Sequence, residues 1–418
     1  MNKINKFIKS PFIIYSGLEK SIYVLFFAKI INSVGSFVYP FLTLFLTQKL
    51  GYSTGRAGFV LMIASISFVP GSILGGKAAD SFGRKKILVA AQFCSALCFM
   101  ACAIIPDKQM IPFLIIGAEF FLGVVHPTSM AMTVDLSRPE NRKAAFSLLY
   151  LGHNIGFAIG PLLAGMLYTN HTAWLFSGDA MTTMLSLVLV VIFVKETRPS
   201  EQQLKESIEN PADEKQSGEK AESGSVFRVL GRRPFLIIFV LLVMLMNFVY
   251  AQMSFSLPLF MNEIFGTEGP VFYGSAMSIN AVIVISCTTV IITLTRKMKP
   301  ILATLLTALL YALGFGALYF GHAFYLIIIC VVIWTVGEIL GATNIDVYIS
   351  NHTPMSHRGR INSIVPVIIG TGYAVSPYIM GKFIEQNSVR MVWPLCFGIG
   401  IIATGGLFVM YLKERRHG

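Results

Sequence analysis

Residues 75–86 read GGKAADSFGRKK and follow directly on a long apolar run. The stretch places Asp80, Gly83 and the three bases Arg84 to Lys86 at the predicted end of a membrane-spanning helix. An acid at such an end is tolerated when a cation or the free N–H groups of a helix terminus stabilise it. Gly83 lets the chain turn so that Arg84 reaches back to Asp80, while the lysines meet anionic lipid. We therefore expect a structured loop between two membrane helices.

The composition is that of an integral membrane protein. Of the 418 residues, 55% are hydrophobic and only 13% are charged, and the mean hydropathy is +0.69. In soluble domains about a quarter of all residues are charged. Apolar runs of about twenty residues recur along the chain, each long enough to cross ~30 Å of hydrocarbon as a helix. The sequence predicts an all-α membrane protein with no large soluble domain.

Twelve membrane helices are expected from these apolar runs. An even number agrees with two termini on the same side of the membrane. The predicted ranges are 21–47, 55–79, 87–105, 111–134, 144–168, 173–194, 233–262, 271–295, 300–320, 324–350, 358–384 and 391–412.

The basic residues are unevenly distributed between the loops. The N-terminal tail, the 75–86 loop, the central linker and the C-terminal tail are rich in Lys and Arg, whereas the alternate loops hold few. The positive-inside rule then places both termini in the cytoplasm. The net charge of +12 is explained by this topology, so we expect no binding of nucleic acid. The expected location is the inner (plasma) membrane of a bacterium.

A polar, charged linker divides the chain. We expect a six-helix bundle over 1–195, a cytoplasmic linker over 196–232 and a second six-helix bundle over 233–418. A shift of 216 residues superposes parts of the two halves. It brings Arg142, Gly156, Pro161 and Gly165 onto Arg358, Gly372, Pro377 and Gly381. This predicts a parallel internal repeat around a central path, as in secondary transporters.

The spacing of Gly76, Asp80, Gly83 and Arg84 resembles the loop signature between helices 2 and 3 of the major facilitator superfamily. The resemblance implies the fold of that family, with two pseudo-symmetric six-helix bundles. It also implies that the loop is a conformational latch that holds the halves together in the outward-facing state. Asp135 is similar to the additional acid that lies near the arginine of the loop. The alternative is simple anchoring by positive charge without gating.

A second resemblance lies in the predicted fifth helix, within GHNIGFAIGPLLAG. This stretch is similar to the antiporter signature of drug:proton exchangers. Glycines let helices approach closely, and a proline bends the helix. The alternative is ordinary close packing of small residues. The residues of this motif are Gly152, Gly156, Gly160, Pro161 and Gly165.

Charged groups at membrane depth are candidates for coupling because they are costly to bury. Glu119 and Glu338 lie in the predicted fourth and tenth helices, which line the cavity in the family, and we expect them to bind protons or a cationic substrate. His126, Asp346 and Lys29 are further candidates. Burial disfavours the charged form, so such a carboxylate can exchange a proton near neutral pH. The alternative is that the acids are paired with Lys29 or with backbone donors.

Polar and aromatic residues on the predicted first, seventh and tenth helices are candidates for contacts with a substrate. Asp179 is expected at the membrane interface. The candidate cavity residues are Asn32, Tyr39, Asn247, Tyr250, Gln252, Phe255 and Asn344.

Together these features favour a proton-coupled secondary active exporter of drug-like or amphipathic molecules. The alternatives are proton-coupled uptake of a nutrient such as a sugar, peptide or organic acid, and transport of lipid or lysolipid. The expected partners are a small-molecule substrate, protons and membrane lipids, and the chain is expected to be a monomer. No cofactor and no metal are expected, because the six cysteines lack a His or acid at ligand spacing. An enzyme is not expected, since no nucleophile and base are arranged for catalysis.

Overall fold

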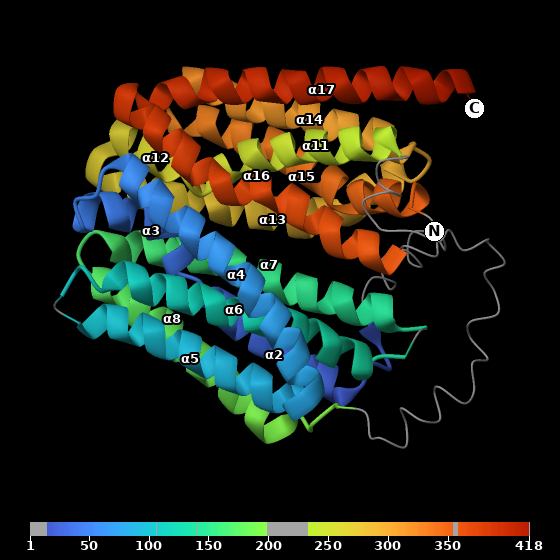
Figure 1. Cartoon of the computed structure of the whole chain (residues 1–418). Coiled ribbons are helices and arrows are strands. Elements are labelled where there is room, and N and C mark those ends of the chain that lie inside the picture. The colour runs from blue at the N-terminus through green and yellow to red at the C-terminus, as the bar shows by residue number, and fades with distance from the viewer. Residues whose placement is uncertain (1–14, 106, 139, 199–232, 354–357, 418) are drawn as a thin grey trace, which may run out of the picture. The chain divides into compact units, whose positions relative to one another are not determined.

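The computed structural model describes residues 15–105, 107–138, 140–198, 233–353 and 358–417 (Figure 1). All regular structure in these ranges is helical. The predicted linker 196–232 therefore lies outside the described residues, apart from its first three positions.

The described residues of the N-terminal half form seven α-helices and a short π-helical segment. The π-helix, Phe45–Lys49, continues directly from the second of them. The α-helices are α2 (Lys20–Val34), α3 (Val38–Leu44), α4 (Thr54–Phe82), α5 (Arg84–Ile104), α6 (Ile111–Asp135), α7 (Arg142–Tyr168) and α8 (Thr172–Phe193).

The C-terminal half is built in the same order. Short 3-10 turns follow several of its helices. The α-helices are α11 (Pro234–Tyr250), α12 (Ser256–Phe265), α13 (Gly269–Thr295), α14 (Pro300–Ala317), α15 (Phe324–Asn351), α16 (Arg358–Gln386) and α17 (Val392–His417).

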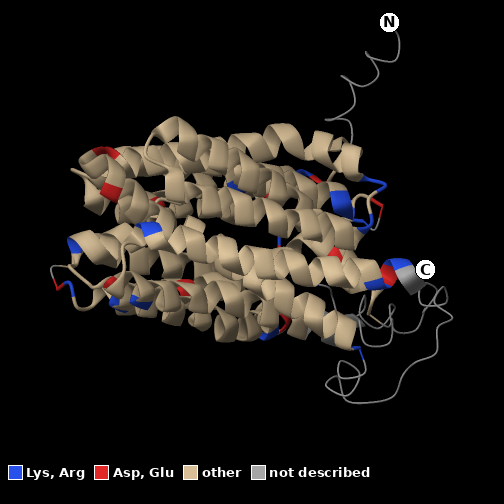
Figure 2. Ribbon diagram, turned by 90° about the horizontal axis from the view of Figure 1, so that it is seen from above, with Lys and Arg blue, Asp and Glu red and all other residues tan. Residues whose placement is uncertain are grey.

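Eleven helical stretches of the described chain are long and apolar enough to cross a membrane. This differs from the predicted twelve because Pro234–Thr295 forms one nearly continuous helical run of 62 residues. Charged residues lie mainly toward the ends of the helices, and the long middle parts carry few (Figure 2).

The chain divides into two compact units, with one boundary inside the predicted linker and the segment Phe41–Met62 grouped with the second half. One unit comprises Met1–Pro40 and Ile63–Glu206, and the other comprises Phe41–Met62 and Ser207–Gly418. The end of the first predicted helix and the start of the second thus pack with the C-terminal half. Within this second unit, Thr54 Oγ1 donates to the carbonyl of Gly381 at 2.8 Å, and the Gly55 N–H donates to Glu385 at 3.0 Å.

The helices repeat with the predicted shift of 216 residues. Arg84 and Pro300, which begin α5 and α14, are separated by this interval, as are Arg142 and Arg358, which begin α7 and α16. Equivalent helices also make equivalent contacts: α2 packs on α7 as α11 packs on α16, and α5 packs on α6 as α14 packs on α15. The two halves therefore follow the same folding pattern.

Glycines of α7 bring this helix against α2. A Cβ atom added at Gly156 would lie 2.5 Å from Ser33 Cβ and 2.7 Å from the carbonyl oxygen of Ile30. At Gly160 it would lie 2.8 Å from the carbonyl oxygen of Val34. In the repeat, Gly372 of α16 approaches the backbone of α11 in the same way. These positions accept only glycine unless the helices move apart.

The predicted helix 21–47 is broken at residues 35–37, between α2 and α3. Asp179 of α8 reaches this break, where its carboxylate accepts a hydrogen bond from the N–H of Val38 at 3.4 Å. The side chain of Asp179 is buried among the helices, with 8% of the residue exposed. Its expected place at the membrane interface stays a prediction. The carboxylate supplies a partner for backbone N–H groups that have no helical acceptor.

The predicted helix 233–262 is broken as well, at residues 251–255. Gln252 is fully buried there; its side-chain N–H donates to Ser376 Oγ, and its carbonyl accepts from Ser256 Oγ at 2.5 Å. Phe255 is 1% exposed. Both residues were expected to line a cavity. In the structure they lie at the break in the helix, and their side chains are buried among other residues.

The close packing of α7 predicts a difference between two glycines. Gly156→Ala should lower the melting temperature of the purified protein, because overpacking of this kind costs about 1–3 kcal/mol. Gly405→Ala is the control, since a Cβ there meets nothing within 4 Å and alanine favours a helix. The measurement is thermal unfolding in detergent. Equal melting temperatures for the two variants would contradict the packing argument.

Candidate functional site

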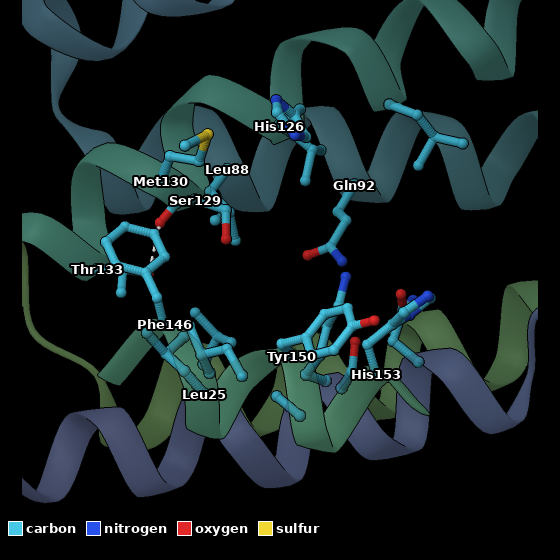
Figure 3. A pocket seen from close by; sticks show the side chains of 18 of the residues that line it. Leu25, Leu88, Gln92, His126, Ser129, Met130, Thr133, Phe146, Tyr150 and His153 are labelled. Atoms are coloured by element: carbon cyan, nitrogen blue, oxygen red, sulfur yellow. Dashed lines mark hydrogen bonds between the residues drawn. The ribbon is translucent and has the colours of Figure 1, made fainter. Parts of the chain in front are cut away.

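The first unit contains a cavity of about 490 Å³. Its walls are formed by α2, α4, α5, α6, α7 and α8 (Figure 3). Aliphatic and aromatic side chains form most of its surface. The polar and charged residues that line it are Lys29, Asn32, Gln92, His126, Ser129, Thr133, Tyr150, His153 and Ser186.

Three of the residues proposed from sequence reach this cavity, namely Lys29, Asn32 and His126. Asn32 is held by a hydrogen bond from its Nδ2 to Thr183 Oγ1 at 2.9 Å. His126 packs edge-on against Phe68, with ring centroids 5.8 Å apart. The cavity thus combines a cation with fixed polar groups.

Glu119 is not part of this lining, although it lies on α6 three residues before Leu122, which is. The carboxylate of Glu119 instead interacts electrostatically with Asp179. The two acids therefore lie in one neighbourhood, close to the break between α2 and α3. The alternative that Glu119 pairs with Lys29 is not realised, since no ion pair of the described residues joins them.

A second cavity, of about 300 Å³, lies in the second unit between α11, α14 and α15. Four residues proposed from sequence line it. They are Glu338, Asp346, Asn247 and Tyr250.

Glu338 is held by hydrogen-bond donors. Asn280 Nδ2 donates to the Glu338 carboxylate at 3.0 Å and to Thr335 Oγ1 at 2.8 Å, and the hydroxyl of Tyr250 also donates to the carboxylate. Tyr250 stacks on Tyr311, with ring centroids 5.4 Å apart. Within the described part of the chain, Glu338 forms no ion pair. An acid held in this way can bind and release a proton without breaking a salt bridge.

Two other proposed residues do not reach either cavity. Tyr39 lies on α3 and is 43% exposed. Asn344 donates to the carbonyl of Leu340 at 2.9 Å and to Thr343 Oγ1 at 3.1 Å, and its side chain is engaged with its own helix.

The loop between α4 and α5 is organised by Arg84. Its guanidinium forms an ion pair with Asp135 at the end of α6 and donates to the carbonyl of Ala131 at 3.1 Å. The distance to Asp80 is longer, at 3.7 Å, and the side chain of Asp80 is 73% exposed, against 15% for Asp135. Asp135 is therefore the principal partner of Arg84.

Glu196 was not found from the sequence. Its carboxylate accepts hydrogen bonds from the backbone N–H of Arg84 at 2.7 Å and of Lys85 at 3.2 Å, at the first turn of α5. Gly83 has φ +106°, and a Cβ there would lie 2.6 Å from Glu196 Oε2, so the turn requires glycine. Arg198 donates to the carbonyl of Ser81 at 2.7 Å. The segment after α8 is thus fixed to the α4–α5 loop.

The hydrogen bonds of Glu196 affect its ionisation. Partial burial opposes the charged form, but backbone N–H groups of Lys85, Arg198, Arg84 and Thr197 outweigh it and hold the pKa of Glu196 below its ordinary value.

Gly76 of the predicted latch motif differs from its neighbour Gly75. A Cβ atom added at Gly76 would meet open space, whereas one at Gly75 would lie 2.6 Å from Val124 Cα. Helix packing therefore constrains Gly75 more than Gly76.

Comparisons with known proteins identify the family of the chain. The sequence pattern of the Major Facilitator Superfamily matches residues 25–365 and 305–418, and the chain belongs to this family. Its members that match here are transporters, not enzymes.

The names of individual relatives describe different transport activities or ligands. A Na(+), Li(+), K(+)/H(+) antiporter of Planococcus maritimus is 25% identical over 394 residues, which cover 89% of each chain. Multidrug resistance protein MdtH of Photorhabdus laumondii is 28% identical over 146 residues, 35% of this chain and 36% of the relative. A crystal structure of a POT family transporter with 5-aminolevulinic acid has a TM-score of 0.76 at 16% identity, covering 96% of this chain and 97% of the other.

The anchoring of α5 predicts faster backbone exchange in Glu196→Gln. Loss of the charge weakens the hydrogen bonds from Arg84 and Lys85, so hydrogen–deuterium exchange of these amides should accelerate on the order of tenfold. Because the folded pKa is lowered, the stabilisation is complete above the ordinary pKa of a glutamate and is lost as pH falls through the lowered value.

The measurement is exchange corrected for intrinsic rates, at neutral and at acidic pH. Proteins that keep Glu196 should lose protection of these amides on acidification, whereas Glu196→Gln should show no such loss. Glu140→Gln, an exposed acid between α6 and α7, is the control. Identical exchange in Glu196→Gln and the control would show that the carboxylate does not hold the loop.

Proposed function

We propose that the protein is a proton-coupled secondary active exporter of amphipathic small molecules that works by alternating access. The observation that carries this proposal is the setting of Glu338. This acid lines a cavity, is held by Asn280 and Tyr250, and has no cationic partner among the described residues. A carboxyl group of this kind can carry a proton and respond to a substrate beside it.

The proposal of export is supported by the glycines of α7 and by the relative that is named a multidrug resistance protein. The latch role of Gly76, Asp80, Gly83, Arg84 and Asp135 is part of the same proposal. The ion pair of Arg84 with Asp135 favours one arrangement of the α4–α5 loop, and a change in this pair would favour another.

We further propose twelve membrane crossings, with both termini in the cytoplasm. The run Pro234–Thr295 contains α11, α12 and α13 and spans about 93 Å as a helix, which is enough for two crossings. Gly266, with φ +54°, makes a turn at the end of α12. The basic loops support this orientation. The protein would act as a monomer in the plasma membrane of a bacterium, surrounded by lipid.

Coupling through Glu338 predicts a specific loss in Glu338→Gln. Gln keeps a similar shape and one oxygen that accepts hydrogen bonds, but it cannot release a proton. Gradient-driven accumulation in liposomes should therefore fall by about 5- to 150-fold, the range of typical coupling free energies, while downhill movement persists. Glu263→Gln, an exposed acid on α12, is the control.

The same liposomes test the direction of coupling. Protons that move opposite to the substrate support export by exchange, whereas protons that move with it would support the uptake alternative. Full uphill accumulation by Glu338→Gln would remove Glu338 from the mechanism, and Asp346, His126 and Glu119 would then be tested in turn.

Exchange of an alkali cation for protons is a second candidate function. It is favoured by the buried Asp179, which lies beside Glu119 at the break between α2 and α3. Interrupted helices with free carbonyls and nearby acids bind cations in other transporters. The relative from Planococcus maritimus is named for this activity.

A cation site at the break predicts stabilisation by sodium or lithium ions. At one hundred times the dissociation constant, binding adds about 2.7 kcal/mol to the stability of the folded state. The melting temperature of the wild-type protein should therefore rise with either ion relative to choline. Asp179→Asn should abolish the rise, and Asp107→Asn, in an exposed loop, should retain it. No rise in the wild-type protein would exclude this second function.

A further inference from the structure

Lys29 is a cation inside the membrane-spanning part of α2. It lies nine residues from the start of the helix, or about 13 Å along its axis. Its side chain lines the cavity of the first unit and is accessible from it. The four ion pairs of the described residues involve Arg84, twice, His352 and Lys382, so Lys29 has no carboxylate partner there.

The rest of the lining does not supply the missing negative charge. No Asp or Glu is among the residues that form this cavity. The groups near the cation are instead neutral and polar. Gln92 points into the cavity, and His126 lies on the same side of it, across from Tyr150 and His153 (Figure 3). His153 receives or donates a hydrogen bond at Nδ1 with Ser33 Oγ, at 3.0 Å, which leaves its other nitrogen for the cavity.

A lysine in such a place is expected to have an anionic partner. An ammonium group at membrane depth is costly unless it is paired, and such groups mark the paths of substrates and ions. Among the described residues none provides a counter-charge, and the carboxylate of a bound molecule would provide one. An amide and two imidazoles beside the cation would complete the hydrogen bonds of a carboxylate.

We propose that this cavity binds the carboxylate of an amphipathic substrate, with Lys29 as the charge partner and Gln92 and His126 as further polar contacts. The inference rests on the proposed function, in that it names the substrate class of that transporter. Phe68, Phe146 and Met130 offer an apolar surface for the body of the molecule. A volume of about 490 Å³ suits a small organic molecule.

The charge of the cavity argues against a cationic substrate at this position. A cation beside Lys29 would be repelled in a medium of low dielectric constant, and no lining acid would offset the repulsion. The second unit has the opposite character, since Glu338 and Asp346 line its cavity. The cavity of the first unit therefore favours negatively charged groups, and the cavity of the second unit favours positively charged groups.

Three probes with the same ring system test the proposal. They are 2-naphthoate, 2-naphthamide and 2-naphthylmethylammonium, and their affinities for the detergent-purified protein are measured by calorimetry. The carboxylate should bind at least about tenfold more tightly than the amide, because a hydrogen bond to a charged partner is stronger than one between neutral groups. The ammonium compound should bind least.

Variants of the lysine locate the effect. Lys29→Met should remove the preference for the carboxylate and leave the amide unchanged, whereas Lys29→Arg should keep the preference. Lys382→Met, which removes a lysine that pairs with Glu385 outside both cavities, is the matched control. If Lys29→Met does not fold, the comparison of the three probes on the wild-type protein and on Lys29→Arg still decides the question.

Three results would overturn the proposal. The first is equal affinity for the carboxylate and the amide. The second is an unchanged preference for the carboxylate in Lys29→Met. The third is that chloride displaces naphthoate and the three organic probes bind with equal affinity. The measurement is made at equilibrium without a proton gradient. A failure of coupling in Glu338→Gln liposomes and a failure of carboxylate binding are therefore separate outcomes.

Discussion

In hydrocarbon every backbone N–H and C=O must find a partner within the protein, and this requirement governs the whole structure. Long helices satisfy it everywhere except where a helix is interrupted. The first helix is interrupted at residues 35–37 and its counterpart in the repeat at residues 251–255, almost the same position under the shift of 216. Asp179 supplies an acceptor at the first break, and Gln252 with Ser376 stabilises the second.

The side chains at these breaks pack within the protein, and none of them lines either cavity. Asp179, Gln252 and Phe255 are polar or aromatic residues in apolar segments, and by sequence they resemble residues of a binding site. Their burial reflects local breaks in the helix that apolar periodicity does not reveal. Lys29 and Glu338 remain, because each faces a cavity and neither forms an ion pair within the described chain.

Much of the architecture was predictable because membrane helices are set by length and apolar composition. The internal repeat and the role of Gly156 in close packing also followed from spacing alone. The orientation of single residues did not, because the faces of helices such as α6 and α15 differ little in hydropathy. Glu119 and His126 lie seven residues apart on α6, yet only His126 lines a cavity. Glu196 was not predicted because it lies in a charged segment, and nothing in that segment indicates that its carboxylate accepts hydrogen bonds from the N–H groups of Arg84 and Lys85.

The repeated pattern of helices also shows how two similar halves can have different chemistry. Under the shift of 216 residues, Lys29 corresponds to Leu245 and Glu338 corresponds to Leu122. Each half thus carries a charge where the other carries a leucine, while Gly156, which brings α7 against α2, is matched by Gly372 in the repeat. A duplicated scaffold of this kind preserves its backbone geometry through packing and diverges through single side chains. The two halves are thus alike in backbone and different in chemistry, like the subunits of a heterodimer. The cavity of one half contains a lysine, and the cavity of the other contains two acids.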